Sequence, residues 1–204
     1  MPGGAASLRW RRMRLFACTL LGEDNQAFYD EHVARLVDAS HGRLRPIPRS
    51  SAHLTYAFLP AVSESDYEHI VAAIDTVKHP VPIAIRLGQP AVLYARKQPR
   101  LVCVDVLGGR PELAGLAKSV PEAVQRACPT ARVDAVRTLH LTLARFRRDA
   151  MRKDGRAVEE LLESSELALE RPDSISEIHI VESSLTPAGP VYTVRHRSRA
   201  SPAA

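Results

Sequence analysis

The sequence is poor in cysteine and in aromatic residues, and it has no long apolar run. Its three cysteines, Cys18, Cys103 and Cys128, are too few and too irregularly spaced for a disulfide framework or a structural zinc site. This usage favours a reducing compartment, so we expect a cytoplasmic protein. Aromatic residues form only 5% of the chain, which argues against a large aromatic platform. No apolar stretch approaches the length of a membrane span, so we expect no membrane partner.

The N-terminal region imitates an export signal only faintly. A basic stretch at residues 9–12 precedes an apolar run from Leu15 to Leu21, but Gly22 and Glu23 follow where a small-residue cleavage site would be needed. We therefore expect this run to be a buried first strand. Residues 1–12 and 197–204 are predicted to be flexible tails on either side of one domain at residues 13–196.

The composition that remains is typical of a globular domain. The chain has 204 residues, of which 45% are hydrophobic and 25% are charged. A chain of this length can bury a core without a disulfide or metal to hold it together. The formal net charge is +5 with the eight histidines left uncounted, which favours an anionic partner.

Strand and helix patterns alternate along the chain and predict an α+β or α/β fold. Strands are expected at residues 14–20, 52–59, 81–87, 91–94, 101–107, 138–145, 176–181 and 191–195. Helices are expected at residues 25–39, 65–77, 111–128 and 156–169. Ser65 and Glu68 indicate a capping box for the second helix, and Pro121 is expected to break or kink the third.

One unit of this pattern occurs twice. A strand and a helix precede a second strand that contains His53-Leu54-Thr55. The same order precedes the strand that contains His140-Leu141-Thr142, 87 residues later. Two repeats of a strand–helix–strand unit would form two pseudo-symmetric lobes of one domain. The paired motifs would then meet at a central cleft.

The repeated tripeptide is the strongest chemical signal in the sequence. With eight histidines and eight threonines in the chain, chance predicts about 0.3 matches to His-x-Thr. Side chains two positions apart on a strand share a face, so each histidine emerges beside its threonine while Leu54 and Leu141 point into the core. Two imidazoles provide an acid and a base near neutral pH, and two hydroxyls can hold phosphate oxygens.

Other kinds of catalytic site find less support. No carboxylate or cysteine accompanies either motif, so we expect neither a metal nor another cofactor. A Gly-x-Ser-x-Gly nucleophile motif is absent, and no cysteine has a catalytic local motif. The remaining histidines have no matching context and are expected to be surface or packing residues: His32, His41, His69, His79, His179 and His196.

At these residues the chain resembles the two-histidine phosphoesterases, and within them the RNA 2′,3′-cyclic phosphodiesterases, also described as 2′–5′ RNA ligases. The resemblance covers most of residues 13–196. It includes the first strand at residues 14–17, the motif strands at 51–59 and 139–145, and a C-terminal hairpin at 182–192. Tyr56 and Pro60 depart from the family pattern, which often has leucine and glycine there.

The resemblance implies a bilobal α+β fold with two pseudo-symmetric lobes of antiparallel sheet and outer helices around a central cleft. It also implies metal-free hydrolysis of an RNA 2′,3′-cyclic phosphate to a 2′-phosphate. By the same resemblance, His53 is the proton donor and His140 the proton acceptor, although spacing alone does not assign these roles. Thr55 and Thr142 would hold phosphate oxygens.

Arg145 matches an arginine that follows the family's second motif, where it could bind phosphate at two points. Regular alternation aims it away from His140, however, so it reaches the cleft only if the strand ends, twists or bulges. Alternation likewise places Phe58 on the core face with Leu54 and Tyr56, whereas the resemblance suggests a place near a bound base.

The expected partners are RNA ends or cyclic nucleotides, bound by a monomer. Basic residues flank both motifs and form either an RNA-steering surface or an ordinary solvated face: Arg43, Arg45, Arg49, Arg137, Arg145, Arg147, Arg148, Arg152, Lys153 and Arg156. Two alternative functions stay open. One is a 2′–5′ oligonucleotide phosphodiesterase or ligase, and the other is a nucleotide- or RNA-binding module with weak turnover.

Overall fold

The computed structural model describes residues 12–22, 29–30, 33–38, 40–79, 82–136, 138–164, 172–187 and 189–199. The strands are β1 (Met13–Leu20), β2 (Leu44–Pro46), β3 (His53–Val62), β4 (Ile83–Ala95), β5 (Gln98–Gly108), β6 (Asp134–Ala135), β7 (His140–Phe146), β8 (Pro172–Ile175), β9 (Glu177–Thr186) and β10 (Gly189–Arg199). The helices are α2 (Glu64–Asp75), α3 (Arg110–Ala127) and α4 (Arg152–Ser164), with a short 3-10 turn at Arg49–Ser51. Residues 29–30 and 33–38 are also helical.

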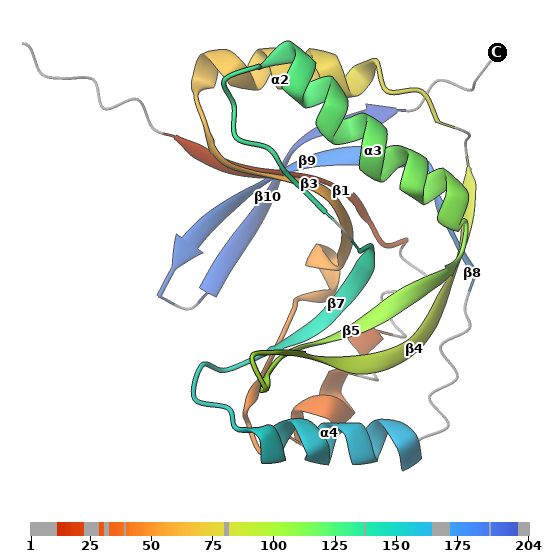
Figure 1. Ribbon diagram of the computed structural model, residues 1–204, viewed down its shortest axis with the longest axis vertical. Coiled ribbons are helices and arrows are strands. Elements are labelled where there is room, and N and C mark those ends of the chain that lie inside the picture. Colours follow the sequence, from red (N-terminus) through yellow and green to blue (C-terminus); the bar gives the residue numbers. More distant parts are fainter. Residues whose placement is uncertain are drawn as a thin grey trace, which may run out of the picture.

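The strands form one antiparallel sheet in the order β10-β9-β1-β3-β7-β5-β4-β8. Figure 1 shows this sheet curving strongly, with α2 and α3 together at one end of the molecule and α4 at the other. Four strands lie on each side of the boundary between β3 and β7, which gives the two lobes. The predicted α+β fold, with two pseudo-symmetric lobes of antiparallel sheet and outer helices, is confirmed.

The predicted duplication accounts for the chain order. β1, a helical segment, β3 and α2 follow one another in the first half, and β5, α3, β7 and α4 follow one another in the second. Cross-strand pairing repeats as well, because Cys18 is opposite Thr55 in one lobe and Cys103 is opposite Thr142 in the other. All three cysteines are buried and free.

Each lobe lends a short strand to the other. β2 precedes β3 in the chain but pairs with β7, and β6 precedes β7 but pairs with β3. The direct contact between the two motif strands is narrow, with Leu54 and Leu141 as cross-strand partners. The exchanged strands therefore add backbone pairing between the two lobes, beyond the short contact between β3 and β7.

The main core lies between the sheet and its helices. Leu54 and Leu141 are each only 1% exposed there, as strand alternation predicts for residues between a histidine and a threonine. A smaller apolar cluster, built on Phe16, Cys18 and Val181, packs separately from the main core. Among the described residues, no helix is both long and apolar enough to cross a membrane.

Several element boundaries differ from the predictions. The cap of α2 is Ser63, whose Oγ accepts from the Asp66 amide at 3.1 Å, and Ser65 already lies within the helix. Pro121 lies inside α3 without ending it, on the buried side of the helix. A proline removes one amide donor but leaves the rest of the helical hydrogen bonds available.

Two predicted breaks in strands were also wrong. β4 continues through Gly88 and Pro90, since irregular pairing with β5 between Leu87 and Pro90 accommodates both residues. β10 continues to Arg199, so residues 197–199 pair with β9 and are not part of a tail. The predicted tail residues 1–11 and 200–204 lie outside the described part of the chain, as do residues 165–169 of the last predicted helix.

Candidate active site

The two motifs meet as the duplication predicts. His53, Thr55, His140 and Thr142 all line one cavity with a volume of about 300 Å³. β3 and β7 are adjacent in the sheet, so the two histidine–threonine pairs come from opposite lobes. All four side chains are partly buried.

A bulge in each motif strand brings one more side chain from that strand to this cavity. Tyr56 is an extra residue on β3 that is skipped in the pairing with β1. Leu143 is the matching extra residue on β7, skipped in the pairing with β5. Tyr56 and Leu143 are both buried in the main core together with the residues that follow them. The alternation is thereby shifted by one, and Phe58 and Arg145 line the cavity.

The bulged residues are bound by the exchanged segments. The carbonyl of Leu143 accepts a hydrogen bond from the Ile47 amide at 3.0 Å, next to β2. The carbonyl of Tyr56 accepts one from the Val136 amide at 3.3 Å, next to β6. Pairing between the lobes therefore satisfies the backbone groups that the bulges withdraw from β1 and β5.

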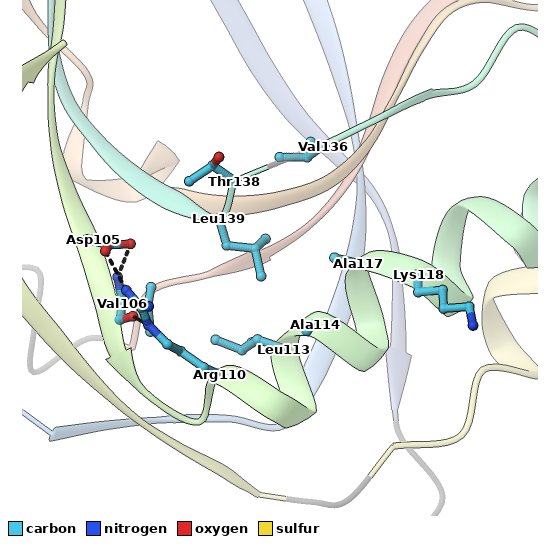
Figure 2. Close-up of a pocket in the computed structure, with 10 residues that line it drawn as sticks. All are labelled: Asp105, Val106, Arg110, Leu113, Ala114, Ala117, Lys118, Val136, Thr138 and Leu139. Carbon is cyan, nitrogen blue, oxygen red and sulfur yellow. Dashed lines mark hydrogen bonds and ion pairs between the residues drawn. The ribbon is translucent and has the colours of Figure 1, made fainter.

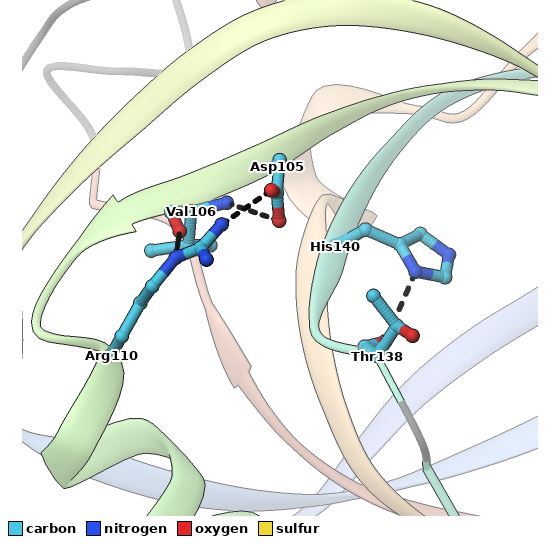
Figure 3. Close-up of polar contacts among 5 residues, drawn as sticks. All are labelled: Asp105, Val106, Arg110, Thr138 and His140. Atoms are coloured by element: carbon cyan, nitrogen blue, oxygen red, sulfur yellow. Dashed lines mark hydrogen bonds and ion pairs between the residues drawn. The ribbon is translucent and has the colours of Figure 1, made fainter.

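Both imidazoles are fixed in the same way. Nδ1 of His53 lies 2.6 Å from the carbonyl oxygen of Ser51, and Nδ1 of His140 lies 3.1 Å from that of Thr138 (Figure 3). A carbonyl can only accept, so each Nδ1 carries a proton and donates it. This sets the tautomer and leaves Nε2 of each ring to exchange a proton with a ligand.

The surroundings of the two histidines differ. Phe16 stacks on His53 with ring centroids 4.6 Å apart, and Tyr192 meets the same imidazole edge-on at 5.7 Å. Burial lowers the pKa of His53, the Ser51 carbonyl partly offsets this, and the positive charges of Arg145 and His140 lower it further. The neutral form of His53 is therefore favoured in the free protein.

His140 has a polar neighbour instead. Its cross-strand partner on β5 is Asp105, which forms an ion pair with Arg110 at the start of α3 (Figure 3). In the other lobe the partner of His53 is Leu20. The duplicated histidines thus have cross-strand partners of different kinds, one apolar and one charged.

The cavity suits an anion. Arg14 and Arg145 line it, and the Arg14 guanidinium lies over the Phe58 ring, 5.3 Å from its centroid. Among the described lining residues none is an aspartate, glutamate or cysteine. Asp66, His69 and Cys128 do place possible ligand atoms within 4.8 Å of one another, but none of these residues lines the cavity.

The predicted basic surface is only partly free for RNA. Arg43 forms an ion pair with Asp149, and Arg49 forms one with Asp30 at 3.2 Å. The Arg147 Nε donates to the Gly42 carbonyl at 3.0 Å. Arg137 lies outside the described residues, and the remaining residues predicted to form this surface are exposed: Arg45, Arg145, Arg148, Arg152, Lys153 and Arg156.

The histidines outside the motifs take no part in the cavity where they are described. His79 and His179 are buried, and His196 Nε2 lies 2.8 Å from Asp75. His41 and His69 are exposed, and His32 lies outside the described residues. Sequence reasoning did not assign seven other lining residues to the site, and none of them belongs to a His-x-Thr motif: Arg14, Phe16, Leu101, Val136, Thr138, Ser183 and Tyr192.

Comparison with known proteins agrees with this architecture. No protein-family model matches the sequence. An RNA 2′,3′-cyclic phosphodiesterase of Aquifex aeolicus (strain VF5) is 25% identical over 145 residues, which are 71% of this chain and 75% of that protein. The crystal structure of TT0787 of Thermus thermophilus has a TM-score of 0.69 at 23% identity, covering 92% of this chain and 97% of its own.

A third similar protein is E. coli LigT, whose complex with 3′-AMP has a TM-score of 0.68 at 20% identity and covers 93% of this chain and 99% of its own. The fold is therefore that of the two-histidine phosphoesterases. Within this superfamily, the curated relative and the structural neighbours support a place beside the RNA 2′,3′-cyclic phosphodiesterases and 2′–5′ RNA ligases, and a phosphoesterase activity.

Proposed function

We propose that this protein hydrolyses RNA 2′,3′-cyclic phosphate ends to 2′-phosphomonoesters without a metal ion. The observation that carries the proposal is the pair of imidazoles on one small cavity, each fixed at Nδ1 by a main-chain carbonyl. The named activity of the Aquifex aeolicus relative supports it, as does the complex of LigT with 3′-AMP.

The reaction needs one proton acceptor and one proton donor. Water attacks phosphorus, a new P–O bond forms, and the bond from phosphorus to O3′ breaks. Nε2 of neutral His140 takes the proton from water, while Nε2 of protonated His53 gives a proton to O3′. The two histidines end the cycle in exchanged protonation states, and proton exchange with solvent restores them.

The pKa of His53 fits a donor that is charged mainly when substrate is present. Burial and neighbouring positive charge favour neutral His53 in the free protein. A bound phosphodiester anion favours the protonated ring, because an opposite charge at short range stabilises the charged form of a titratable group. Substrate binding thus prepares the donor.

The remaining groups bind the phosphate. The hydroxyls of Thr55 and Thr142 and the guanidinium of Arg145 line the same cavity as the histidines. Hydrogen bonds from these donors to the non-bridging oxygens become stronger as negative charge grows in the transition state. Two hydroxyls, one from each lobe, can hold the phosphate between the acid and the base.

Product chemistry tests the proposal directly. The purified protein is incubated with a 2′,3′-cyclic mononucleotide and with RNA that ends in a cyclic phosphate, and the products are separated by chromatography. Formation of the 2′-phosphate alone, lost in His53→Ala and His140→Ala, is the expected result. A 3′-phosphate product, or turnover only of 2′–5′-linked oligonucleotides, would overturn it, and binding without turnover would favour a binding module.

A further inference from the structure

A second cavity, with a volume of about 520 Å³, opens beside the cavity that His53 and His140 line, which we call the catalytic cavity. It lies between the first turns of α3 and the segment that leads into β7 (Figure 2). Val136 and Thr138 line both cavities, so the two spaces share one wall. A ligand longer than one nucleotide could therefore extend over this wall from the first cavity into the second.

The second cavity combines an apolar surface with positive charge. Leu113 and Leu139 contribute apolar side chains, and the small side chains of Ala114 and Ala117 on α3 leave the space open (Figure 2). Arg110 and Lys118 also line it, against one carboxylate from Asp105. A nucleotide matches this combination, because the flat faces of its base are apolar and its phosphate is an anion.

Arg110 is held in position before any ligand arrives. Its Nε donates to the Val106 carbonyl at 2.6 Å, and its Nη2 donates to the Asp105 carboxylate. A guanidinium has five N–H donors, so these two bonds leave others to face a ligand. The side chain is 58% exposed, which leaves those donors accessible to a phosphate.

The geometry of the catalytic cavity directs an RNA chain toward this space. Its volume of about 300 Å³ lies at the lower end of the range for small-ligand sites, so one nucleotide fills it. On the side of β1 and β10, Phe16, Tyr192 and His53 contact one another and form an aromatic wall. The nucleotide next to the cyclic end must therefore lie elsewhere.

A third cavity, of about 570 Å³, also borders His140 and Thr138. Its described lining includes Asp105 but no lysine or arginine, so it offers a phosphate polar donors but no permanent positive charge. The cavity beside α3 shares the same wall and has two cationic side chains. The cavity beside α3 therefore suits a polyanion better than the third cavity does.

We infer that the cavity beside α3 binds the nucleotide that precedes the cyclic phosphate end of RNA. Arg110 contacts the internucleotide phosphate, and the base of that nucleotide lies against Ala114 and Leu139. This inference rests on the proposed function for the identity of the substrate. It predicts that the protein prefers a dinucleotide with a cyclic end over a cyclic mononucleotide.

Paired substrates and paired variants test the inference. In the unaltered protein, kcat/KM for the dinucleotide is expected to exceed that for the mononucleotide by about tenfold, the worth of one charge-assisted hydrogen bond to the internucleotide phosphate. Arg110→Gln removes the phosphate partner, and Ala114→Leu fills the cavity from an exposed helix position. Ala114→Leu should abolish the preference and leave kcat/KM for the mononucleotide unchanged. Arg110→Gln should also abolish the preference, which is a ratio of two kcat/KM values and so does not depend on any change that both substrates share through Asp105, the cross-strand partner of His140.

Two control variants make the same chemical changes away from the cavity. Arg126→Gln changes an exposed charge at the far end of α3, and Ala72→Leu enlarges an exposed alanine on α2. Both should keep the full preference. If Arg110→Gln and Ala114→Leu also keep it, or if the unaltered protein shows no preference, the inference is wrong.

Binding of a dinucleotide that ends in a 2′-phosphate, measured by calorimetry, gives the same comparison without turnover. Weaker binding in Arg110→Gln and Ala114→Leu alone supports the subsite even if the protein hydrolyses neither cyclic substrate, in which case the proposed function fails by itself. Equal binding in all four variants refutes the subsite even if the mononucleotide is hydrolysed.

Discussion

Replacing Arg145 with glutamine tests whether the bulge at Leu143 aims this side chain at the substrate phosphate. A charge-assisted hydrogen bond of this kind is worth about 1.5–3 kcal/mol. Arg145 is exposed, and contact with solvent weakens such a bond, so the lower value applies. Arg145→Gln should therefore reduce kcat/KM for a cyclic mononucleotide by about tenfold.

The same substitution should move one limb of the pH profile. The charge of Arg145 lowers the pKa of His53, so its removal raises that pKa toward the ordinary value for histidine. The profile of kcat/KM reports groups of the free enzyme. If His53 donates the proton, activity requires its charged form and the alkaline limb moves to higher pH. If His53 accepts the proton, the acidic limb moves to higher pH.

The assay is initial-rate hydrolysis across the pH range in which histidine titrates, at constant ionic strength. Arg148→Gln is the matched control, because Arg148 is exposed just after β7 and does not line the cavity. The control should keep both the rate and the profile. A loss of less than about twofold with no shift of either limb in Arg145→Gln would refute the placement of this guanidinium.

Three further predictions concern the same site, and a fourth concerns the stability of the fold. His53→Ala and His140→Ala should each lower kcat by about 10²–10⁴-fold in folded protein, and near-normal turnover in either would exclude the acid–base pair. Chelator should leave the rate unchanged, whereas complete loss with recovery by a divalent ion would contradict the mechanism. The advantage of RNA ends over cyclic mononucleotides in kcat/KM should shrink as salt rises, and a salt-independent advantage would point to base or ribose contacts instead. Burial lowers the pKa of both His53 and His179, so the unfolded chain binds protons more readily. Stability in urea should therefore fall as pH decreases below about 6.5, and a midpoint that rises on acidification would contradict this.

The motif positions could be predicted from sequence because alternation along a strand is a local property. The duplicated His-Leu-Thr placed two histidines and two threonines toward one cleft, and the structure brings all four to one cavity. The proton-transfer roles of His53 and His140 stay predictions, since the geometry fixes the tautomers but not the direction of transfer. The fold followed from the repeated order of strand, helix and strand.

Alternation failed where pairing between distant strands overrides it. Phe58 reaches the cavity because Tyr56 is an extra residue opposite β1. Arg145 reaches it because Leu143 is an extra residue opposite β5. Nothing in the local sequence marks these residues as bulged, since both are ordinary apolar or aromatic strand residues. The bulges depend on hydrogen bonds from segments that precede the partner motif, which alternation does not describe.

The aromatic wall around His53 was missed for a related reason. Phe16 lies on β1 and Tyr192 on β10, and only the sheet order brings these two strands near each other on either side of β9. No spacing in the sequence links residues so far apart. The same long-range pairing carries β4 through Gly88 and Pro90, where local breaker signals predicted two separate strands.

The exchange of β2 and β6 makes the two halves of the chain interdependent. The carbonyl of Tyr56 needs the Val136 amide from the second half, and the carbonyl of Leu143 needs the Ile47 amide from the first. A half-length chain with one motif could recover these bonds only by intertwining with a second copy of itself. The present molecule is equivalent to such a dimer fused into one polypeptide. Fusion allows each copy of the motif to differ from the other, and here one imidazole has aromatic neighbours while the other histidine has Asp105 as its cross-strand partner.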